Sequence, residues 1–382
     1  MAASSVPAPT SATDGFDVLG TTVVANGRVT TKVGCLKDLS ATTLEAAFRR
    51  RVGPLIGWDN PHIYPLGNGR RLWLVHDSYL DYQGGAQTLH DRGPQIQNLA
   101  FVQQGTCFTL IHRGTQTNRL NFEPGIGGVP GTSFFWPLGG ALHRSRLQIF
   151  WGKMAYSVPR PGPGDGLTRH PVSTWLATYN PKTLERVSFE RAPNAGVFPQ
   201  YGFAVESTTQ HTYLFGNSNL LNLDREGGFY NGPHSATKMY LARVPLGRLE
   251  VAPSYRTADG WSSEASDAVP ISSRFFVENT MQPRRFGDRW ISVAKVDGFW
   301  GSDVVIDVAD KPWGPWRTVR RFEHQTRYGN DIMNSYQPIL LPWVQRSGQL
   351  GIVISENARS WPEAVANPAL YRPSVMSVPF PP

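Results

Sequence analysis

Two aspartates near the start of the chain have the spacing of a catalytic carboxylate pair. Asp59 precedes a predicted β-hairpin and Asp77 ends it, and each lies nine residues from Asn68 in the Gly67-Asn68-Gly69 turn. A three-residue loop centred on Asn68 places the two side chains opposite each other, whereas a two-residue Asn-Gly turn shifts the register by one residue. In both registers the carboxylates lie close together.

A pair of opposed carboxylates suits glycoside hydrolysis better than it suits folding. Like charges opposite each other destabilise a sheet, and at a buried site the pKa of one of them rises. A glycosidase needs one ionised carboxylate as nucleophile or base and one protonated carboxyl for the leaving oxygen. The competing interpretation is structural, with Asp59 capping a turn at Asn60-Pro61 and Asp77 capping the loop from Ser78. If the two carboxylates face each other at the mouth of a central channel, as the fold predicted below would place them, the catalytic interpretation is favoured.

Other strand ends carry further candidate residues. Glu206 and Glu278 are additional candidate acids, and Asp297 and Glu356 follow two other predicted strands. A single loop carboxylate is more often solvated or paired than catalytic. Aromatic rings at strand ends can stack on sugar faces, although core filling is the usual role of any one ring. The predicted substrate-binding residues are Trp58, Trp136, Tyr201, Asn279, Tyr336 and Gln337.

A strand that recurs five times would position these residues. The copies begin at Arg71, Arg146, His211, Arg289 and Gln349, at intervals of 75, 65, 78 and 60 residues. Each copy is apolar at nearly every position and follows a turn and another short strand. Such a repeat predicts an all-β fold, a five-bladed β-propeller with four-stranded antiparallel blades around a central channel. The first strand of a blade starts, and the second ends, at the same mouth of that channel.

The two ends of the chain are expected to differ in order. Residues 1–15 are predicted to be disordered or flexible, and residues 16–382 to form a single propeller domain with one short helix over residues 44–51. The last blade lacks a fourth strand of its own. A hairpin within residues 16–33, with Asn26-Gly27 as a type I′ turn, is expected to complete that blade and close the ring.

Composition narrows the class of function. The formal net charge is +8, but the basic residues are dispersed and form no nucleic-acid-binding motif, so no nucleic-acid partner is expected. No apolar run reaches the roughly 18 residues of a membrane span. Nucleotide-binding, zinc-binding and serine-hydrolase motifs are absent from the sequence, so neither a cofactor nor a metal is predicted.

The start of the chain is typical of an exported protein. Residues 2–12 resemble the low-complexity start that follows a removed leader. Cys35 and Cys107 permit one disulfide, and the sequence is equally compatible with a bridge and with two free thiols. A secreted or cell-envelope monomer is therefore expected.

Residues 57–79 resemble the opening blade of an actinobacterial propeller family, the endo-D-arabinofuranases of glycoside hydrolase family 183, formerly a domain of unknown function. The Gly-Arg-Arg-Leu-Trp-Leu-Val-His-Asp run ending at Asp77 is similar to that family's Gly-Arg-x-Leu-Trp-Leu-Phe-x-Asp pattern. Residues 309–316 resemble a turn of the fourth blade in such hydrolases. His76-Asp77-Ser78 stands where many members carry Gly-Asp-Thr. The resemblance spans most of the chain and implies that Asp59 and Asp77 match the two catalytic aspartates.

The resemblance implies an endo-acting hydrolase of furanoside linkages in the D-arabinan of mycobacterial arabinogalactan or lipoarabinomannan. Its expected partner is thus a polysaccharide substrate. One alternative is a propeller that binds a glycan or a protein without catalysis. Another is a hydrolase of a different glycan, such as a fructan or a sialoside. Fold by itself does not distinguish among these.

Overall fold

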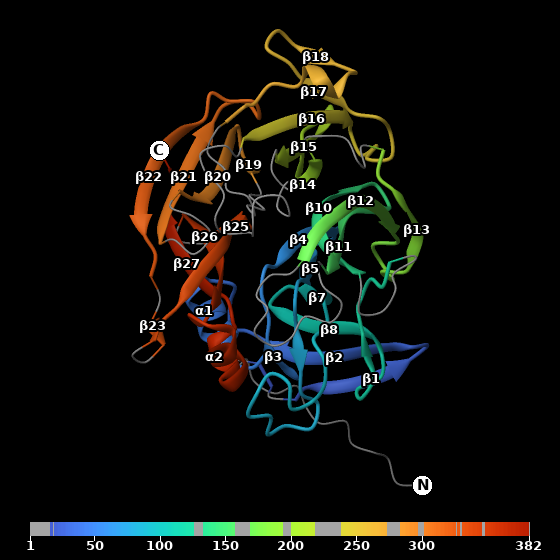
Figure 1. Ribbon diagram of the computed structural model, residues 1–382, viewed down its shortest axis with the longest axis vertical. Helices are drawn as coiled ribbons and strands as arrows, with labels where there is room; N and C mark the ends of the chain where they lie inside the picture. The colour runs from blue at the N-terminus through green and yellow to red at the C-terminus, as the bar shows by residue number, and fades with distance from the viewer. Residues whose placement is uncertain are drawn as a thin grey trace.

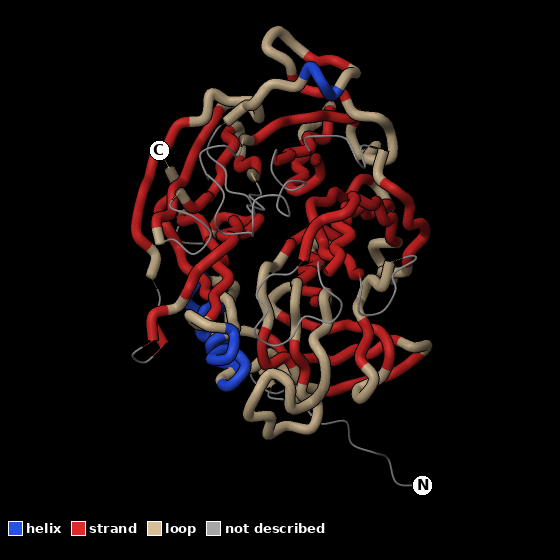
Figure 2. Tube along the Cα trace, viewed as in Figure 1, coloured by secondary structure: helices blue, strands red, loops and turns tan. Residues whose placement is uncertain are grey.

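Antiparallel β-sheet dominates the computed structural model, and helices are few (Figure 2). The structure describes residues 16–17, 19–125, 133–156, 169–193, 200–217, 238–272, 283–296, 302–325, 327–328, 331–345 and 348–381. The predicted flexible segment 1–15 lies outside these residues. Short apolar segments separated by Gly, Pro and Asn turns favour strands over helices, which explains the all-β architecture. None of the described helices is long and apolar enough to cross a membrane.

Within the described residues, five sheets of three or more strands follow one another around a ring (Figure 1). Blade one contains β4 (His62–Gly67), β5 (Arg70–Val75), β7 (Leu99–Gln104) and β8 (Cys107–Gly114), with β9 (Arg119–Leu120) paired to β8. Blade two contains β10 (Ser133–His143), β11 (Arg146–Tyr156), β12 (Arg169–Tyr179) and β13 (Arg186–Arg191). Blade three contains β14 (Gln200–Ser207), β15 (His211–Asn217), β16 (Met239–Pro245), β17 (Ser254–Arg256) and β18 (Trp261–Ser262).

The other two blades complete the ring. Blade four contains β19 (Arg284–Phe286), β20 (Arg289–Lys295), β21 (Asp303–Ala309) and β22 (Arg317–Glu323). Blade five contains β25 (Asn334–Val344), β26 (Gln349–Asn357) and β27 (Ser374–Pro379). Short elements connect or cover the blades: β3 (Leu55–Gly57), β6 (Tyr79–Leu80), η2 (Ala265–Asp267), β23 (Arg327–Tyr328), β24 (Asp331–Ile332), α2 (Trp361–Ala366) and η3 (Pro368–Leu370).

Buried apolar clusters join each described blade to the next. The cluster between blades three and four, for example, packs Phe215 against Trp290. The cluster that closes the ring packs Val353 and Val375 of blade five against Trp73 of blade one. Equivalent clusters join blades one and two, two and three, and four and five. The predicted β-propeller is therefore confirmed, and in the described parts of the chain four blades have at least four strands and the fifth has three.

The expected role of the N-terminal hairpin is wrong. Strands β1 (Thr21–Ala25) and β2 (Arg28–Cys35) form the hairpin, but β2 pairs with β8 and so extends blade one (Figure 1). The outer side of blade five is covered instead by α1 (Ala41–Phe48), where the Glu45 carboxylate accepts a hydrogen bond from the Val375 N–H of β27. The helix thus covers the sheet edge that a fourth strand would otherwise pair with. Helix α1 begins before residue 44 because Ser40 caps it, its Oγ accepting from Thr43 N at 3.2 Å.

A disulfide between Cys35 and Cys107 fixes this extension of blade one. The two residues are directly paired across β2 and β8, 72 residues apart in the sequence. Cross-linking so distant a pair restricts the unfolded chain, so we expect the Cys35→Ser/Cys107→Ser double variant to lose about 2–4 kcal/mol of unfolding free energy. Chemical denaturation with and without reductant measures this loss. Equal stability of the wild type and the double variant under oxidising conditions would contradict it.

Candidate active site

A type I′ hairpin in blade one brings Asp59 next to Asp77. Asn68 and Gly69 have φ of 51° and 71°, as a two-residue type I′ turn requires. The register between β4 and β5 shifts once, between Pro65 and Gly67. Beyond the paired strands, the His76 N–H donates to the Asp59 carbonyl oxygen at 3.1 Å. The shift gives the strands the register expected for a three-residue loop, with His62 opposite Leu74, and the bond from His76 places Asp59 within one position of Asp77.

Each aspartate is held by a side chain from a neighbouring blade. The Tyr336 hydroxyl of β25 donates to Asp59 Oδ2 at 2.6 Å, and the Trp136 Nε1–H of β10 donates to Asp77 Oδ1 at 3.2 Å. Asp59 and Asp77 are only 8% and 6% exposed. Since hydrogen bonds that a carboxylate accepts favour its ionised form, these two donors offset part of the cost of burying the charges. Both donors come from near the starts of inner strands, at the same mouth of the channel.

Tyr371 indicates that the two carboxylates face one region. Its side chain is 2% exposed, and burial raises the pKa of Tyr371 well above its ordinary value. The charges of Asp59 and Asp77 both add to this rise in the pKa of Tyr371, so one phenol is close enough to interact with both carboxylates. Sequence reasoning missed Tyr371, because it follows η3 in a segment with no hairpin or motif around it.

A buried lysine occupies the same repeat position as Asp77. Lys295 ends the strand copy that begins at Arg289, just as Asp77 ends the copy that begins at Arg71. Lys295 is 3% exposed, and its Nζ donates to the carbonyl oxygen of Ser335, the residue before Tyr336. Aligning the five strand copies would have identified Lys295 from the sequence. The structure thus places an ammonium group beside the residue that holds Asp59.

Trp58 and Tyr201, predicted as sugar-binding residues, are core residues, so that prediction is wrong. Trp58 is 1% exposed and meets Phe48 of α1 edge-on at 5.0 Å between ring centroids. Successive side chains of an extended chain point to opposite sides, so Trp58 faces the core while its neighbour Asp59 faces the channel mouth. Tyr201 is fully buried between blades two and three, 5.3 Å from the ring of Tyr255.

Trp136 is the predicted aromatic that borders the carboxylates from a partly exposed position. Its ring stacks on His76 at 4.9 Å. His76 is buried, and its imidazole contacts Asn60 Nδ2 and the Pro137 carbonyl oxygen, as expected for a structural histidine. Gln337 follows Tyr336 with a left-handed φ of 47°, at a point where the register of β25 and β26 shifts. Its contact with substrate stays a prediction.

The additional candidate acids do not join Asp59 and Asp77 in the described part of the chain. Glu206 lies near the end of β14, and it lines a cavity together with the Gly67 and Gly69 turn residues, at the mouth opposite Asp59. Burial raises the pKa of Glu206 to about 6. Glu206 is thus not a partner of the aspartate pair, because inner strands carry their two ends to opposite mouths. Glu278 and Asn279 lie outside the described residues, as does Asp297.

Glu356 is structural, and the described acidic side chains form no metal site. Glu356 is fully buried in an ion pair with Arg49 at 2.7 Å, and it also contacts His324, which gives it a structural role. Among the residues that the structure describes, no group of three or more His, Cys, Asp or Glu side chains could hold a metal ion.

The chain matches one protein family and shares its fold with a known structure. Residues 44–379 match the model of a family described as a domain of unknown function, DUF5005. No curated protein matches the chain. A candidate hydrolase from Bacteroides ovatus has a similar structure, with a TM-score of 0.62 and 16% identity over 95% of this chain and 93% of that one. This similarity shows a shared fold and not a shared activity.

Enzymes named as GH43 are more distant in structure. The GH43_1 enzyme from Xanthomonas citri gives a TM-score of 0.46 and 11% identity, over 84% of this chain and 87% of that one. A GH43 β-xylosidase/α-arabinofuranosidase from a compost metagenome gives a TM-score of 0.42 and 10% identity, over 84% of this chain and 91% of that one. At this level of similarity, neither enzyme indicates the function of this chain.

Proposed function

We propose that this chain, which belongs to the DUF5005 family, is a glycoside hydrolase that uses Asp59 and Asp77 as its catalytic pair. The main support is that two adjacent, buried carboxylates lie at one mouth of the channel, and that a hydrogen-bond donor from a neighbouring blade holds each of them. Burying two like charges beside each other disfavours folding, so their retention is better explained by chemistry that needs both.

In this mechanism the two aspartates divide the roles of acid and nucleophile or base. One carboxyl group protonates the glycosidic oxygen as the bond from that oxygen to the anomeric carbon breaks. The other carboxylate either bonds to the anomeric carbon and is then released by water, or takes the proton from an attacking water. Tyr336 and Trp136 fix one oxygen of each carboxylate and so orient the rest of the group. The carbonyl oxygen of Tyr371 accepts from the Trp58 N–H at 2.9 Å, which fixes the backbone next to Asp59.

The proposed substrate is a furanoside polymer, cleaved internally, with D-arabinan as the leading candidate. The support is the resemblance of residues 57–79 to endo-D-arabinofuranases, in which Asp59 and Asp77 match the catalytic aspartates. Trp136 offers a partly exposed aromatic ring beside Asp77 for contact with a sugar face. We further propose that the protein is exported as a monomer, since the Cys35–Cys107 disulfide suits an oxidising compartment.

A screen of the wild-type protein against arabinogalactan, linear arabinan, fructan and a sialoside tests the proposed substrate. We expect reducing ends to appear with the D-arabinan-containing polymers, as oligosaccharides of several lengths from the first time points. Release from fructan or the sialoside alone would replace the arabinan assignment. Binding of a glycan with no release from any of them would favour a non-catalytic propeller.

A further inference from the structure

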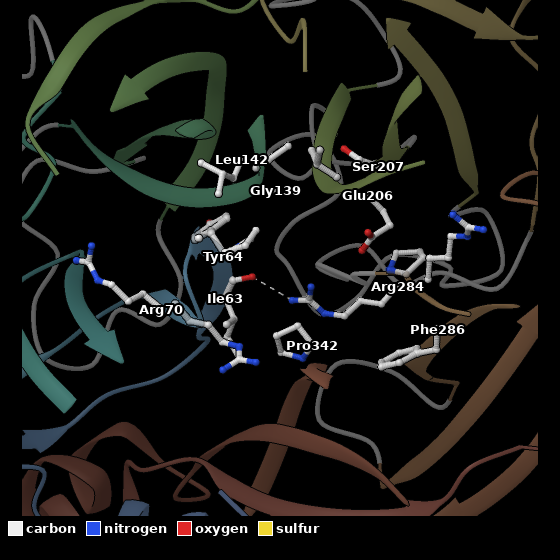
Figure 3. Close-up of a pocket in the computed structure, with 18 of the residues that line it drawn as sticks. Ile63, Tyr64, Arg70, Gly139, Leu142, Glu206, Ser207, Arg284, Phe286 and Pro342 are labelled. Atoms are coloured by element: carbon white, nitrogen blue, oxygen red, sulfur yellow. Dashed lines mark hydrogen bonds between the residues drawn. The ribbon is translucent and has the colours of Figure 1, made fainter. Parts of the chain in front are cut away.

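A cavity lies at the mouth of the channel opposite the aspartates. Its volume is about 370 Å³, within the usual range of small-ligand sites. The inner strands β4, β10, β14 and β19 of blades one to four contribute to its lining, together with the second strand β5 of blade one and Pro342 of blade five (Figure 3). Tyr64 forms part of its wall and is fixed there by donating its hydroxyl hydrogen to the Leu138 carbonyl oxygen. The catalytic proposal uses none of these residues.

The charged groups lining this cavity are mostly positive. Four arginines line it, Arg70, Arg71, Arg284 and Arg285, whereas Glu206 is the one carboxylate among the described lining residues. An enclosed excess of guanidinium groups attracts anions more strongly than the same charges do on an open surface, because the surrounding protein screens them less. The cavity therefore favours an anionic ligand.

Two of the arginines are held in place before any ligand arrives. Arg284 donates from Nε to the Leu340 carbonyl oxygen at 2.9 Å and from Nη2 to the Ile63 carbonyl oxygen at 3.2 Å (Figure 3). It thereby links blade four to blades five and one. The guanidinium of Arg71 lies 4.6 Å from the ring centroid of Trp343, a cation–π contact that restricts its rotation. Guanidinium groups fixed in this way lose less entropy when they bind a carboxylate.

Glu206 makes the positive charge of the cavity dependent on pH. Its side chain extends into the cavity toward Arg284 (Figure 3), and it accepts backbone hydrogen bonds from Ser207 and Arg285. Burial raises the pKa of Glu206 to about 6, with Arg284 opposing the rise. Above that pH an ionised Glu206 repels an anion, and below it the neutral carboxyl group does not.

We propose that this cavity is a second binding site, for a carboxylate-bearing sugar residue of an acidic glycan. The choice of a sugar rests on the proposed function. A polysaccharide would bind at the mouth that contains Asp59 and Asp77, and this cavity lies at the opposite mouth of the same channel. A planar carboxylate matches the paired N–H groups of a guanidinium, such as that of Arg71. Prolines, glycines, aliphatic side chains such as Leu142 and Val205, and the Phe286 ring supply apolar parts of the wall.

Binding of a uronate should tighten as the pH falls from 7.5 to 5.5. Over this range Glu206 becomes neutral, while the uronate stays ionised because its pKa lies near that of other carboxylic acids, about 4. The other charged or phenolic groups that line the cavity do not change charge in this range: Arg284 and Arg285 of β19, Arg70 and Arg71 of β5, and Tyr64 of β4. Burial also holds the pKa of the nearby His62 well below its ordinary value, so this imidazole stays neutral.

Calorimetric titration of the full chain with trigalacturonate tests the proposal, with neutral galactotriose as the matched probe. We expect Arg71→Gln to weaken trigalacturonate binding at least about tenfold, as loss of a charge-assisted hydrogen bond implies. Glu206→Gln should tighten binding at pH 7.5 and remove the pH dependence. Arg317→Gln on the exposed outer strand β22 makes the same change in net charge and should leave the affinity unaltered.

Several results would overturn this site. The site would be wrong if trigalacturonate did not bind at either pH, or if galactotriose bound equally well. It would also be wrong if Arg71→Gln kept the wild-type affinity, or if Glu206→Gln kept the wild-type pH dependence. A different result would contradict the catalytic proposal. Asp77→Asn should bind trigalacturonate as the wild type does, so a wild type that binds the uronate but hydrolyses nothing would contradict the catalytic proposal alone.

Discussion

Asp59→Asn and Asp77→Asn are each expected to lower the rate of furanoside hydrolysis by about 10²- to 10⁴-fold, the usual contribution of a positioned acid or base. Asparagine keeps the size of the side chain and can still accept from Tyr336 or Trp136, so binding of the polysaccharide should persist. Initial rates on arabinan, with affinity measured separately, distinguish loss of chemistry from loss of binding. Asp310→Asn, at an exposed position after β21, is the matched control and should leave the rate unchanged.

The same two variants assign the roles of the aspartates. On an aryl furanoside with a good leaving group, the variant that lacks the general acid should recover much of its rate, because this bond breaks without protonation. The variant that lacks the nucleophile or base should stay slow with both substrates. Rates within threefold of wild type for both variants on both substrates would remove Asp59 and Asp77 from the mechanism.

Glu356→Ala is expected to lower the free energy of unfolding by about 3 kcal/mol, because it removes the buried partner of a largely buried guanidinium, which keeps only its more exposed partner Glu45. Glu356 of β26 is fully buried and pairs with Arg49 at the end of α1, so it ties that helix to blade five. Denaturant titration measures the loss. Glu190→Ala on the exposed edge strand β13 is the control, with an expected change within about 0.5 kcal/mol. A Glu356→Ala loss below 1 kcal/mol would contradict this structural role.

The repeating part of the fold could be predicted from the sequence, whereas the closure of the ring could not. Strand copies such as those beginning at Arg146 and Gln349 coincide with β11 and β26, because apolar runs between turns are a local signal. Asn26-Gly27 correctly indicated a type I′ hairpin, with φ of 52° and 68°. A turn does not specify which sheet edge its strands join. That choice depended on α1 covering β27 and on β2 pairing with β8, both long-range contacts.

The candidate site shows the same limit. Asp59 and Asp77 lie on one hairpin, so their proximity followed from local register. Tyr371 and Lys295 reach the same mouth from distant segments, and only comparison of the repeats would have indicated Lys295. Trp58 was misassigned because its sequence position beside Asp59 says nothing about which side of the chain its ring faces. Helix α1, with Phe48 against that ring, decides the matter.

Time-resolved product analysis of purified D-arabinan, incubated with the wild type and with Asp77→Asn, tests the catalytic role of the aspartate pair most directly. If the pair is catalytic, the wild type releases oligosaccharides of intermediate length from the earliest time points. Asp77→Asn should release none over the same period while still co-sedimenting with the insoluble polymer. Co-sedimentation of both proteins with no product from either would show that the aspartate pair is not catalytic and leave a propeller that binds glycan without cleaving it.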